Sequence, residues 1–191
     1  MSRPSFDALD ALPEPDGSEE LLVFFDTEFT SMECPQLLSI GMVAESGEEL
    51  YIEIACAKEN VISDFVRHQV LPLLGLSNPL VLEYDTVVAH LEVWFDKLRG
   101  GDRDIGIVLI TDYPVDWMLV LELRMPNPGE PSWTRAINVG GRMVSHMVAS
   151  DRQMAAYFEG IERFHQTTKQ RHHALVDARA MKYAYAKARS E

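Results

Sequence analysis

Two carboxylates one residue apart follow an apolar run near the start of the chain. Asp26 and Glu28 come directly after LLVFF at residues 21–25, a run typical of a strand buried on both faces. Because strand side chains alternate, both acids project from the same face. Such acids repel each other unless a cation lies between them, and Mg²⁺ or Mn²⁺ prefers carboxylate oxygen. Taken alone, the pair also fits a solvated strand end in an acidic chain.

A second pair of acids follows a later apolar run. The run at residues 104–112 ends in Asp112, and Asp116 comes four residues later, in the first turn of a helix that begins near Pro114. In open α/β sheets the carboxyl ends of strands border the binding site, so Asp116 is expected close to Asp26. Asp112 either faces that site or caps the helix, a role worth about 1 kcal/mol that needs no chemistry.

Two histidines and an acid lie near the C-terminus. His172 and His173 stand at the entrance of the last expected helix, and Asp177 lies early in that helix. A histidine titrates near neutral pH and can act as a general base, so this segment adds a fourth acid and a base. The alternative for each histidine is a surface position at a helix start.

The elements that must position these residues indicate one α/β domain. The length of 191 residues suits a single domain, with a flexible leader over residues 1–20 and the folded part over 21–191. The expected strands are 21–26, 37–46, 49–56 and 104–112, the second and third forming an antiparallel hairpin. The expected helices are 61–74, 85–99, one starting at Pro114, 151–165 and 174–187, with a long loop over 124–150. This order predicts a mixed β-sheet flanked by helices on both faces.

The composition limits the classes of partner. The net charge of −13 argues against binding long nucleic acids by bulk electrostatics, but a metal-filled site would supply positive charge locally. No apolar run approaches the roughly 20 residues that cross a bilayer, and the N-terminus has no signal-peptide pattern, so we expect a cytoplasmic protein without membrane contact. Cys34 and Cys56 show no spacing that suggests a zinc site or a disulfide framework.

The combination of these segments resembles the DEDDh exonucleases of the DnaQ-like superfamily, which have an RNase H-like fold. The matching strings are FFDTEFT at 24–30, LLSIGMVAESGEELYIE at 37–53, ITDYPVDWMLV at 110–120 and HHALVDARAMKYAY at 172–185. The last is the most specific, because it fits the pattern His-x-Ala-x-x-Asp-Ala. The short chain and the Phe after Glu28 are most similar to the small bacterial, RNase T-like 3′–5′ exoribonucleases.

The resemblance implies a role for each matching residue. It makes His172 the general base and predicts two Mg²⁺ or Mn²⁺ ions, held by four carboxylates: Asp26, Glu28, Asp116 and Asp177. It places four further residues near the 3′-terminal nucleotide: Thr27, Phe29, Thr30 and Asp112. Phe29 either stacks on the terminal base or belongs to the core.

The sequence departs from the family pattern at two positions and is ambiguous at a third. Asp112 stands where the family commonly has Asn, and Val115 where it usually has an aromatic residue. A sister class places Tyr four residues before the last Asp, a spacing that His173 holds. The alanines on both sides of Asp177, at 174 and 178, favour the register in which His172 is the base.

These observations predict a metal-dependent 3′–5′ exoribonuclease that acts on single-stranded or 3′-overhanging RNA. The alternatives are a DNA 3′–5′ exonuclease of proofreading type and a catalytically silent module that binds nucleic acid or protein. The basic stretch at 163–171 either guides the phosphate backbone or is a solvated helix end. The resemblance also implies a homodimer, because related small exonucleases often pair.

Overall fold

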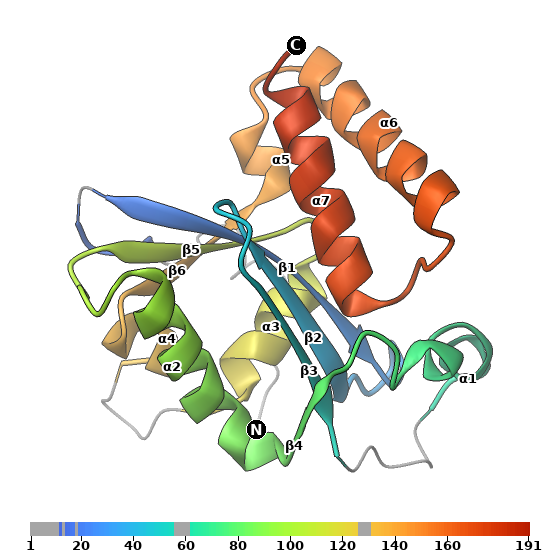
Figure 1. Ribbon diagram of the computed structural model, residues 1–191, viewed down its shortest axis with the longest axis horizontal. Helices are drawn as coiled ribbons and strands as arrows, with labels where there is room; N and C mark the ends of the chain where they lie inside the picture. Colours follow the sequence, from blue (N-terminus) through green and yellow to red (C-terminus); the bar gives the residue numbers. More distant parts are fainter. Residues whose placement is uncertain (1–11, 13, 18, 56–61, 126–130) are drawn as a thin grey trace.

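The computed structural model describes residues 12, 14–17, 19–55, 62–125 and 131–191. Within them the chain forms one mixed six-stranded sheet in the order β4-β3-β2-β1-β5-β6 (Figure 1). The strands are β1 (Glu20–Phe29), β2 (Leu37–Ala44), β3 (Glu49–Ile54), β4 (Leu80–Leu82), β5 (Gly106–Thr111) and β6 (Val139–Met143). β1, β2 and β3 are antiparallel neighbours, whereas β5 and β6 continue the sheet parallel to β1. The predicted single α/β domain with a mixed sheet and an opening hairpin is confirmed.

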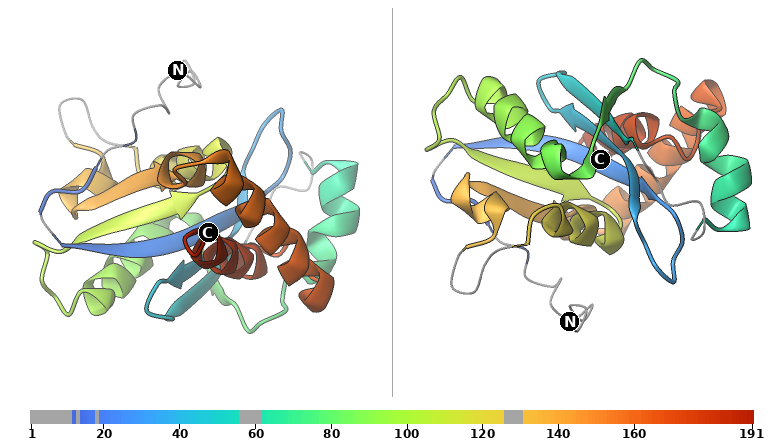
Figure 2. Two further views of the ribbon diagram at one scale, coloured as in Figure 1. Left: turned by 90° about the horizontal axis from the view of Figure 1, so that it is seen from above. Right: turned by 90° about the horizontal axis from the view of Figure 1, so that it is seen from below.

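Helices cover both faces of the sheet (Figures 1 and 2). They are α1 (Asp64–Gln69), α2 (Val87–Leu98), α3 (Pro114–Glu122), α4 (Trp133–Ala136), α5 (Val144–Met147), α6 (Asp151–Thr168) and α7 (Ala174–Ala188). The alternation along β1 divides the core into two layers: Phe25 packs with α2 and α3, and Phe24 packs with α6 and α7 on the opposite face. The face of β1 that carries Phe24 also carries Asp26 and Glu28, so both acids face the α7 side.

The prediction of a long loop over residues 124–150 was wrong. In its described part, this segment contains α4, the edge strand β6 and the short helix α5. Gly140 and Gly141 were among the residues that indicated a loop, but both lie within β6. A Cβ at position 141 would lie only 3.0 Å from the ring of Trp117 in α3, so the glycine permits close packing of a helix on the strand.

Several element boundaries also differ from the prediction. The helix expected over 61–74 is the shorter α1 followed by a 3₁₀ turn at Leu71–Leu73, because Pro72 cannot continue an α-helix. β4 has only three residues and was not predicted. β1 extends to Phe29, so Asp26 and Glu28 lie inside the strand and not beyond its end. Residue 56 at the end of the third predicted strand lies outside the described residues.

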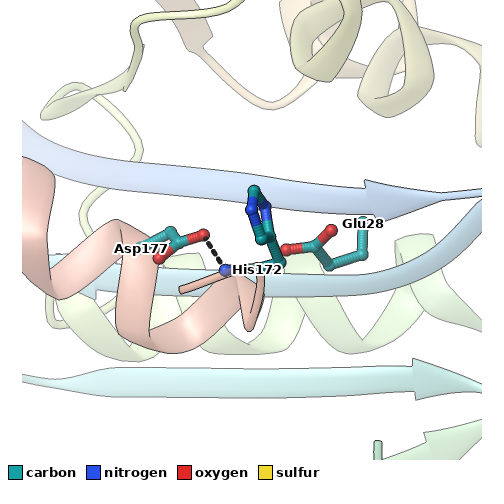
Figure 3. Close-up of side chains that lie close together, drawn as sticks. All are labelled: Glu28, His172 and Asp177. Carbon is teal, nitrogen blue, oxygen red and sulfur yellow. Dashed lines mark hydrogen bonds between the residues drawn. The ribbon is translucent and has the colours of Figure 1, made fainter. Parts of the chain in front are cut away.

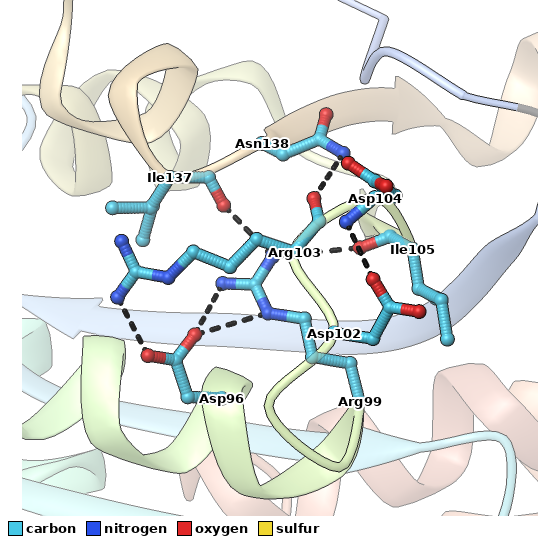
Figure 4. A network of polar contacts seen from close by, with 8 residues as sticks. All are labelled: Asp96, Arg99, Asp102, Arg103, Asp104, Ile105, Ile137 and Asn138. Carbon is cyan, nitrogen blue, oxygen red and sulfur yellow. Dashed lines mark hydrogen bonds and ion pairs between the residues drawn. The ribbon is translucent and has the colours of Figure 1, made fainter.

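A buried arginine joins the C-terminal end of α2 to the edge of the sheet at which β5 and β6 begin (Figure 4). Arg99 is 3% exposed and donates hydrogen bonds to Asp96 and to the carbonyl oxygen of Ile137, the latter at 2.9 Å. Arg103 donates to the other carboxylate oxygen of Asp96 at 2.6 Å. A buried guanidinium needs such partners, and here they join α2 to the segments that enter β5 and β6.

Part of the predicted leader packs against this same edge. The backbone of Asp16 exchanges hydrogen bonds with the side-chain amide of Asn138, and Arg142 pairs with Glu14 and Glu20. Whether residues 1–20 as a whole form a flexible leader stays a prediction. Among the described residues, no helix is both long and apolar enough to span a membrane.

Candidate active site

The register of β1 and β2 places the first acid pair opposite two small residues. Asp26 lies across from Gly41 and Glu28 across from Ser39. A Cβ built on Gly41 would overlap the backbone of Ala174 and Leu175, so the first turn of α7 rests directly on the glycine. Only glycine permits this approach, and it brings the start of α7 to the side of β1 that carries the two acids.

Asp116 reaches the same place from the first turn of α3. It is 1% exposed and lies beside the helix N-terminus, where the macrodipole favours a negative charge. Thr27 donates a hydrogen bond to Oδ1 of Asp116 at 2.6 Å, and Thr111 donates to Oδ2 at 2.8 Å. Hydroxyl groups from β1 and from the end of β5 therefore fix the orientation of this buried carboxylate.

The turn between α6 and α7 brings His172 to Asp177. His172 has a φ of 69°, a left-handed conformation that costs a non-glycine residue roughly 1–2 kcal/mol. Its backbone N–H donates to Oδ2 of Asp177 at 2.9 Å, which helps to hold this conformation. Figure 3 shows Glu28 beside the ring of His172. One ligand atom each from Glu28, His172 and Asp177 lie within 4.8 Å of one another.

These side chains line one cavity of about 570 Å³. Its polar lining includes the four predicted metal ligands, Asp26, Glu28, Asp116 and Asp177, and the further polar residues Thr27, Ser31, Glu33, Ser63 and His172. Its wall is largely apolar and includes Phe29, Met32, Phe65, Val66, Val70 and Tyr113. Phe65 and Met32 are more than half exposed. Exposed apolar side chains therefore form an apolar rim around the opening of the cavity, and the carboxylates lie inside it.

Burial raises the pKa values of all four carboxylates. Burial, and then the charges of Asp177 and Asp116, raises the pKa of Glu28 to about 9. Burial raises the pKa of Asp116 to about 7, although the hydroxyls of Thr27 and Thr111 oppose the shift. Burial also raises the pKa of Asp177 to about 7, and burial with the neighbouring acids raises the pKa of Asp26 well above its usual range. Without cations, the site therefore retains protons near neutral pH.

This donor set fits hard divalent cations. Carboxylate oxygens are the ligands that Mg²⁺ and Mn²⁺ prefer, and cations in the cavity would offset the burial and the repulsion that raise these pKa values. Burial followed by the charge of Arg171 lowers the pKa of His172, so its ring is neutral and able to accept a proton near pH 7. The arrangement can therefore hold cations beside a neutral base.

The two histidines have different environments. His172 lines the cavity, whereas His173 is 1% exposed and its ring packs 4.5 Å from that of Tyr51 on β3. The carbonyl of His173 accepts hydrogen bonds from the backbone of Val176 and Asp177, so this residue is the N-cap of α7. The alternative of a surface position is wrong for His173. Of His172 and His173, therefore, only His172 brings its ring to the acids.

The four residues expected near a nucleotide differ in position. Thr27 and Phe29 line the cavity, and Phe29 also packs against the core, so stacking of a base on its ring stays a prediction. Thr30 is fully buried and does not line the cavity; its hydroxyl donates to the carbonyl of Cys34 and accepts from the N–H of Gln36. It therefore shapes the loop after β1.

Asp112 is neither a cavity-lining residue nor a helix cap in the described part of the chain. The N-cap of α3 is Tyr113, and the carboxylate of Asp112 accepts a hydrogen bond at 2.9 Å from the hydroxyl of Tyr157 on α6. The capping alternative was therefore wrong. Asp112 remains close enough for its charge to raise the pKa values of Asp26, Asp116 and Asp177.

Sequence reasoning missed several residues at the site. Thr111 could have been suspected, because it is a polar residue that ends an apolar strand immediately before an acid. Phe65 and Met32 had no such signal, since they belong to segments whose distance from the acids depends on the folded chain. His165, whose ring lies at Asp177, was considered only within a basic stretch.

The mixed six-stranded sheet with helices on both faces is a fold that other solved structures share. Solved structures of exonuclease I are similar to this chain. One that describes how processivity is achieved has a TM-score of 0.55 at 14% identity, over 89% of this chain and 40% of its own. A product-bound structure has a TM-score of 0.57 at 11% identity, over 91% of this chain and 44% of its own.

A third similar structure contains SSB and exonuclease I with the inhibitor CFAM, with a TM-score of 0.55 at 11% identity, over 91% of this chain and 42% of its own. The chain thus spans about two fifths of the length of the exonuclease I chains that it matches. No family model and no curated protein matches the sequence.

Proposed function

We propose that this protein is a metal-dependent 3′–5′ exonuclease that removes nucleotides from single-stranded or 3′-overhanging RNA. One observation carries the proposal: four carboxylates from β1, α3 and α7 and a neutral histidine converge in a single cavity. The elements that contribute them are far apart in the chain. A convergence of five such groups is hard to explain by surface charge alone, because burying carboxylates without cations is unfavourable.

In this proposal each side chain has a defined task. Asp26, Glu28, Asp116 and Asp177 hold two Mg²⁺ or Mn²⁺ ions, which when bound supply Lewis acidity for attack on the terminal phosphodiester and for departure of the 3′ oxygen. His172 takes the proton from the attacking water. The water oxygen bonds to phosphorus as the bond to the 3′ oxygen breaks, so a nucleoside 5′-monophosphate leaves and the shortened chain keeps a 3′-hydroxyl.

The apolar rim supports a single-stranded substrate. Phe65 is 54% exposed at the mouth of the cavity, and its ring lies edge-on to that of His172 with 4.9 Å between the centroids. An exposed aromatic ring beside the catalytic groups offers a stacking surface for an unpaired base near the 3′ end. Phe29 borders the same cavity from β1. Paired bases are stacked on their neighbours and would have to separate before using these rings.

The preference for RNA rests on the resemblance to RNase T-like enzymes, and a DNA exonuclease would use the same carboxylates and histidine. The likeness to exonuclease I supports exonuclease chemistry on this fold without separating the two substrates. Recognition of a 2′-hydroxyl is the chemical difference that would select RNA. The assay must therefore compare RNA and DNA of the same sequence directly.

The test is shortening of 5′-labelled oligonucleotides of identical sequence, one RNA and one DNA, with Mg²⁺ or Mn²⁺. We expect a ladder of products shortened from the 3′ end, faster for RNA, and no products in excess EDTA. The isosteric substitutions Glu28→Gln and Asp116→Asn should abolish shortening, because each removes a charged ligand. Glu83→Gln, at an exposed acid at the end of β4, is the matched control and should retain full activity.

Two results would change the proposal. Faster shortening of DNA would favour the DNA exonuclease. A folded wild-type protein that shortens neither substrate with either metal would favour a silent binding module.

A further inference from the structure

A third histidine lies against one of the site carboxylates. The Nε2 atom of His165, in the last turn of α6, is 3.3 Å from Oδ1 of Asp177. The side chain of His165 is 9% exposed, and its Nδ1 atom has no hydrogen-bond partner among the described residues. A polar ring is thus held in a largely buried position with one of its nitrogen atoms directed at Asp177.

The carboxylate of Asp177 is constrained from two directions. Its Oδ2 atom accepts the backbone N–H of His172 at 2.9 Å, and its Oδ1 atom, which makes no hydrogen bond among the described residues, lies 3.3 Å from Nε2 of His165. A quarter turn of the carboxylate about its Cβ–Cγ bond would break the hydrogen bond to His172 and move Oδ1 away from Nε2 of His165. The orientation of Asp177 therefore depends on a residue of α6 as well as on the turn before α7.

The backbone of His165 also helps to end α6, directly before the turn that carries His172. The carbonyl oxygen of His165 accepts the N–H of Lys169, a left-handed residue that ends α6. The backbone of His165 thus belongs to one end of the turn, while its side chain reaches Asp177 at the other end. Because His172 lies between these two points, the position of His165 affects both the carboxylate and the base.

We propose that His165 is a positioning residue, whose ring holds the Asp177 carboxylate in the orientation that binds a cation and, through Asp177, holds the backbone of His172. The inference rests on the metal-binding role of Asp177 in the proposed function. Neighbours that orient a metal-binding side chain typically contribute about 10–100-fold to metal affinity or activity. His165 does not itself have to touch substrate or cation.

The experiment measures Mn²⁺ affinity by calorimetry, together with kcat, KM and thermal stability, for the full chain and its variants. His165→Leu removes the ring nitrogens and should weaken Mn²⁺ binding about 10–100-fold and lower kcat, with little change in the KM for the oligonucleotide. His165→Gln places an amide nitrogen near the position of Nε2 and should restore most of the affinity. Rescue by Gln is the result that a purely structural role would not produce.

Ile161→Ala is the matched control, because Ile161 is a half-buried residue of the same helix that packs in the apolar α6–α7 contact. It should lower the melting temperature without changing Mn²⁺ affinity. If His165→Leu does not fold, His165→Met supplies an apolar side chain that adapts more easily to the same space. Wild-type Mn²⁺ affinity in either apolar variant would overturn the proposal, as would equal losses in the Leu, Gln and Ile161→Ala proteins.

Asp177→Asn separates this inference from the function on which it rests. The positioning role alone is overturned if the wild type and His165→Leu both bind Mn²⁺ but Asp177→Asn does not bind it. If the wild type binds no Mn²⁺, or Asp177→Asn binds it as the wild type does, the metal-binding role of Asp177 fails and the inference fails with it.

Discussion

Gly41 of β2 supports the backbone of Ala174 at the start of α7 without any side chain between them. Gly41 is also the neighbour of Asp26 in the sheet, so the glycine brings helix and strand together where the site forms. The distance between the acids of β1 and the residues of α7 depends on this contact.

Gly41→Ala should therefore damage both stability and the site. The added methyl group must push α7 away from the sheet, and overpacking of this kind typically costs about 1–3 kcal/mol. Asp177 and His172 would move with the helix, so we expect weaker Mn²⁺ binding and lower kcat as well as a lower melting temperature. Val43→Ala, two residues along on the same face, should lower stability while leaving Mn²⁺ affinity unchanged. Equal Mn²⁺ affinity in wild type and Gly41→Ala would contradict the argument.

Thr27→Val should weaken cation binding through Asp116. The valine keeps the shape of threonine but removes the hydroxyl that donates to Oδ1 at 2.6 Å, a bond that lowers the pKa of Asp116. Hydrogen bonds to charged groups contribute about 1.5–3 kcal/mol, which corresponds to roughly 10–150-fold in Mn²⁺ affinity measured by calorimetry. Thr27→Ser should retain most of the affinity.

The control for this substitution is Thr134→Val, which changes another fully buried threonine, located in α4. It should affect only the melting temperature. A similar loss of Mn²⁺ affinity in both valine variants would show that the effect is not specific to Asp116.

The two histidines should separate catalysis from stability. His172→Ala is expected to lower kcat by about 10²-fold or more, the loss typical of a missing general base, with little effect on folding. His173→Ala removes a buried ring that packs on Tyr51, so it should lower the free energy of unfolding by about 1–3 kcal/mol and leave kcat close to wild type below the melting temperature. The opposite pattern of kcat values would assign the base to His173.

Without metal, the protein should become less stable as the pH rises from 7 to 9.5. The unfolded chain has already released its carboxyl protons near pH 4, whereas the folded protein retains protons on Asp116 and Asp177 up to about pH 7 and on Glu28 up to about pH 9. Because the folded state binds more protons than the unfolded state in this range, the free energy of unfolding falls with increasing pH. His165, His172 and His173, whose pKa values burial lowers, are neutral in both states above pH 7 and do not oppose the trend.

The measurement is the melting temperature in EDTA and in Mg²⁺ or Mn²⁺ across this pH range. Cations should remove most of the decline, since they stabilise the ionised carboxylates of the folded state. A melting temperature in EDTA that is constant or rises from pH 7 to 9.5 would contradict the raised pKa values.

Phe65→Ala should raise the KM for single-stranded oligonucleotides. Base stacking on an aromatic side chain contributes about 1–3 kcal/mol, which predicts a KM increase of roughly 5–150-fold with a smaller change in kcat. The ring is more than half exposed, so the melting temperature should hardly change. Phe158→Ala removes an equally exposed ring from α6, outside the residues that line the cavity, and should leave the KM unchanged. Equal effects of the two substitutions would exclude stacking on Phe65.

Much of the architecture could be predicted from local patterns. Apolar runs and their alternation located β1, β2, β3 and β5, and helical periodicity located α2, α3, α6 and α7, with errors mainly at their ends. β4 and β6 could not be found in this way. β4 is too short to show a period, and the glycines of β6 indicate a turn unless the ring of Trp117 that packs on Gly141 is known.

The sequence by itself determined which groups could carry the chemistry: the pair Asp26 and Glu28, then Asp116, then His172 with Asp177, each recognisable from residue type and spacing. Only the tertiary structure decided which side chains surround them. It directed Asp112 to Tyr157, buried His173 against Tyr51, and brought Phe65 and His165 to the site. The physical reason is that a motif depends on residues close in the chain, whereas orientation and burial depend on packing between elements that are distant in it.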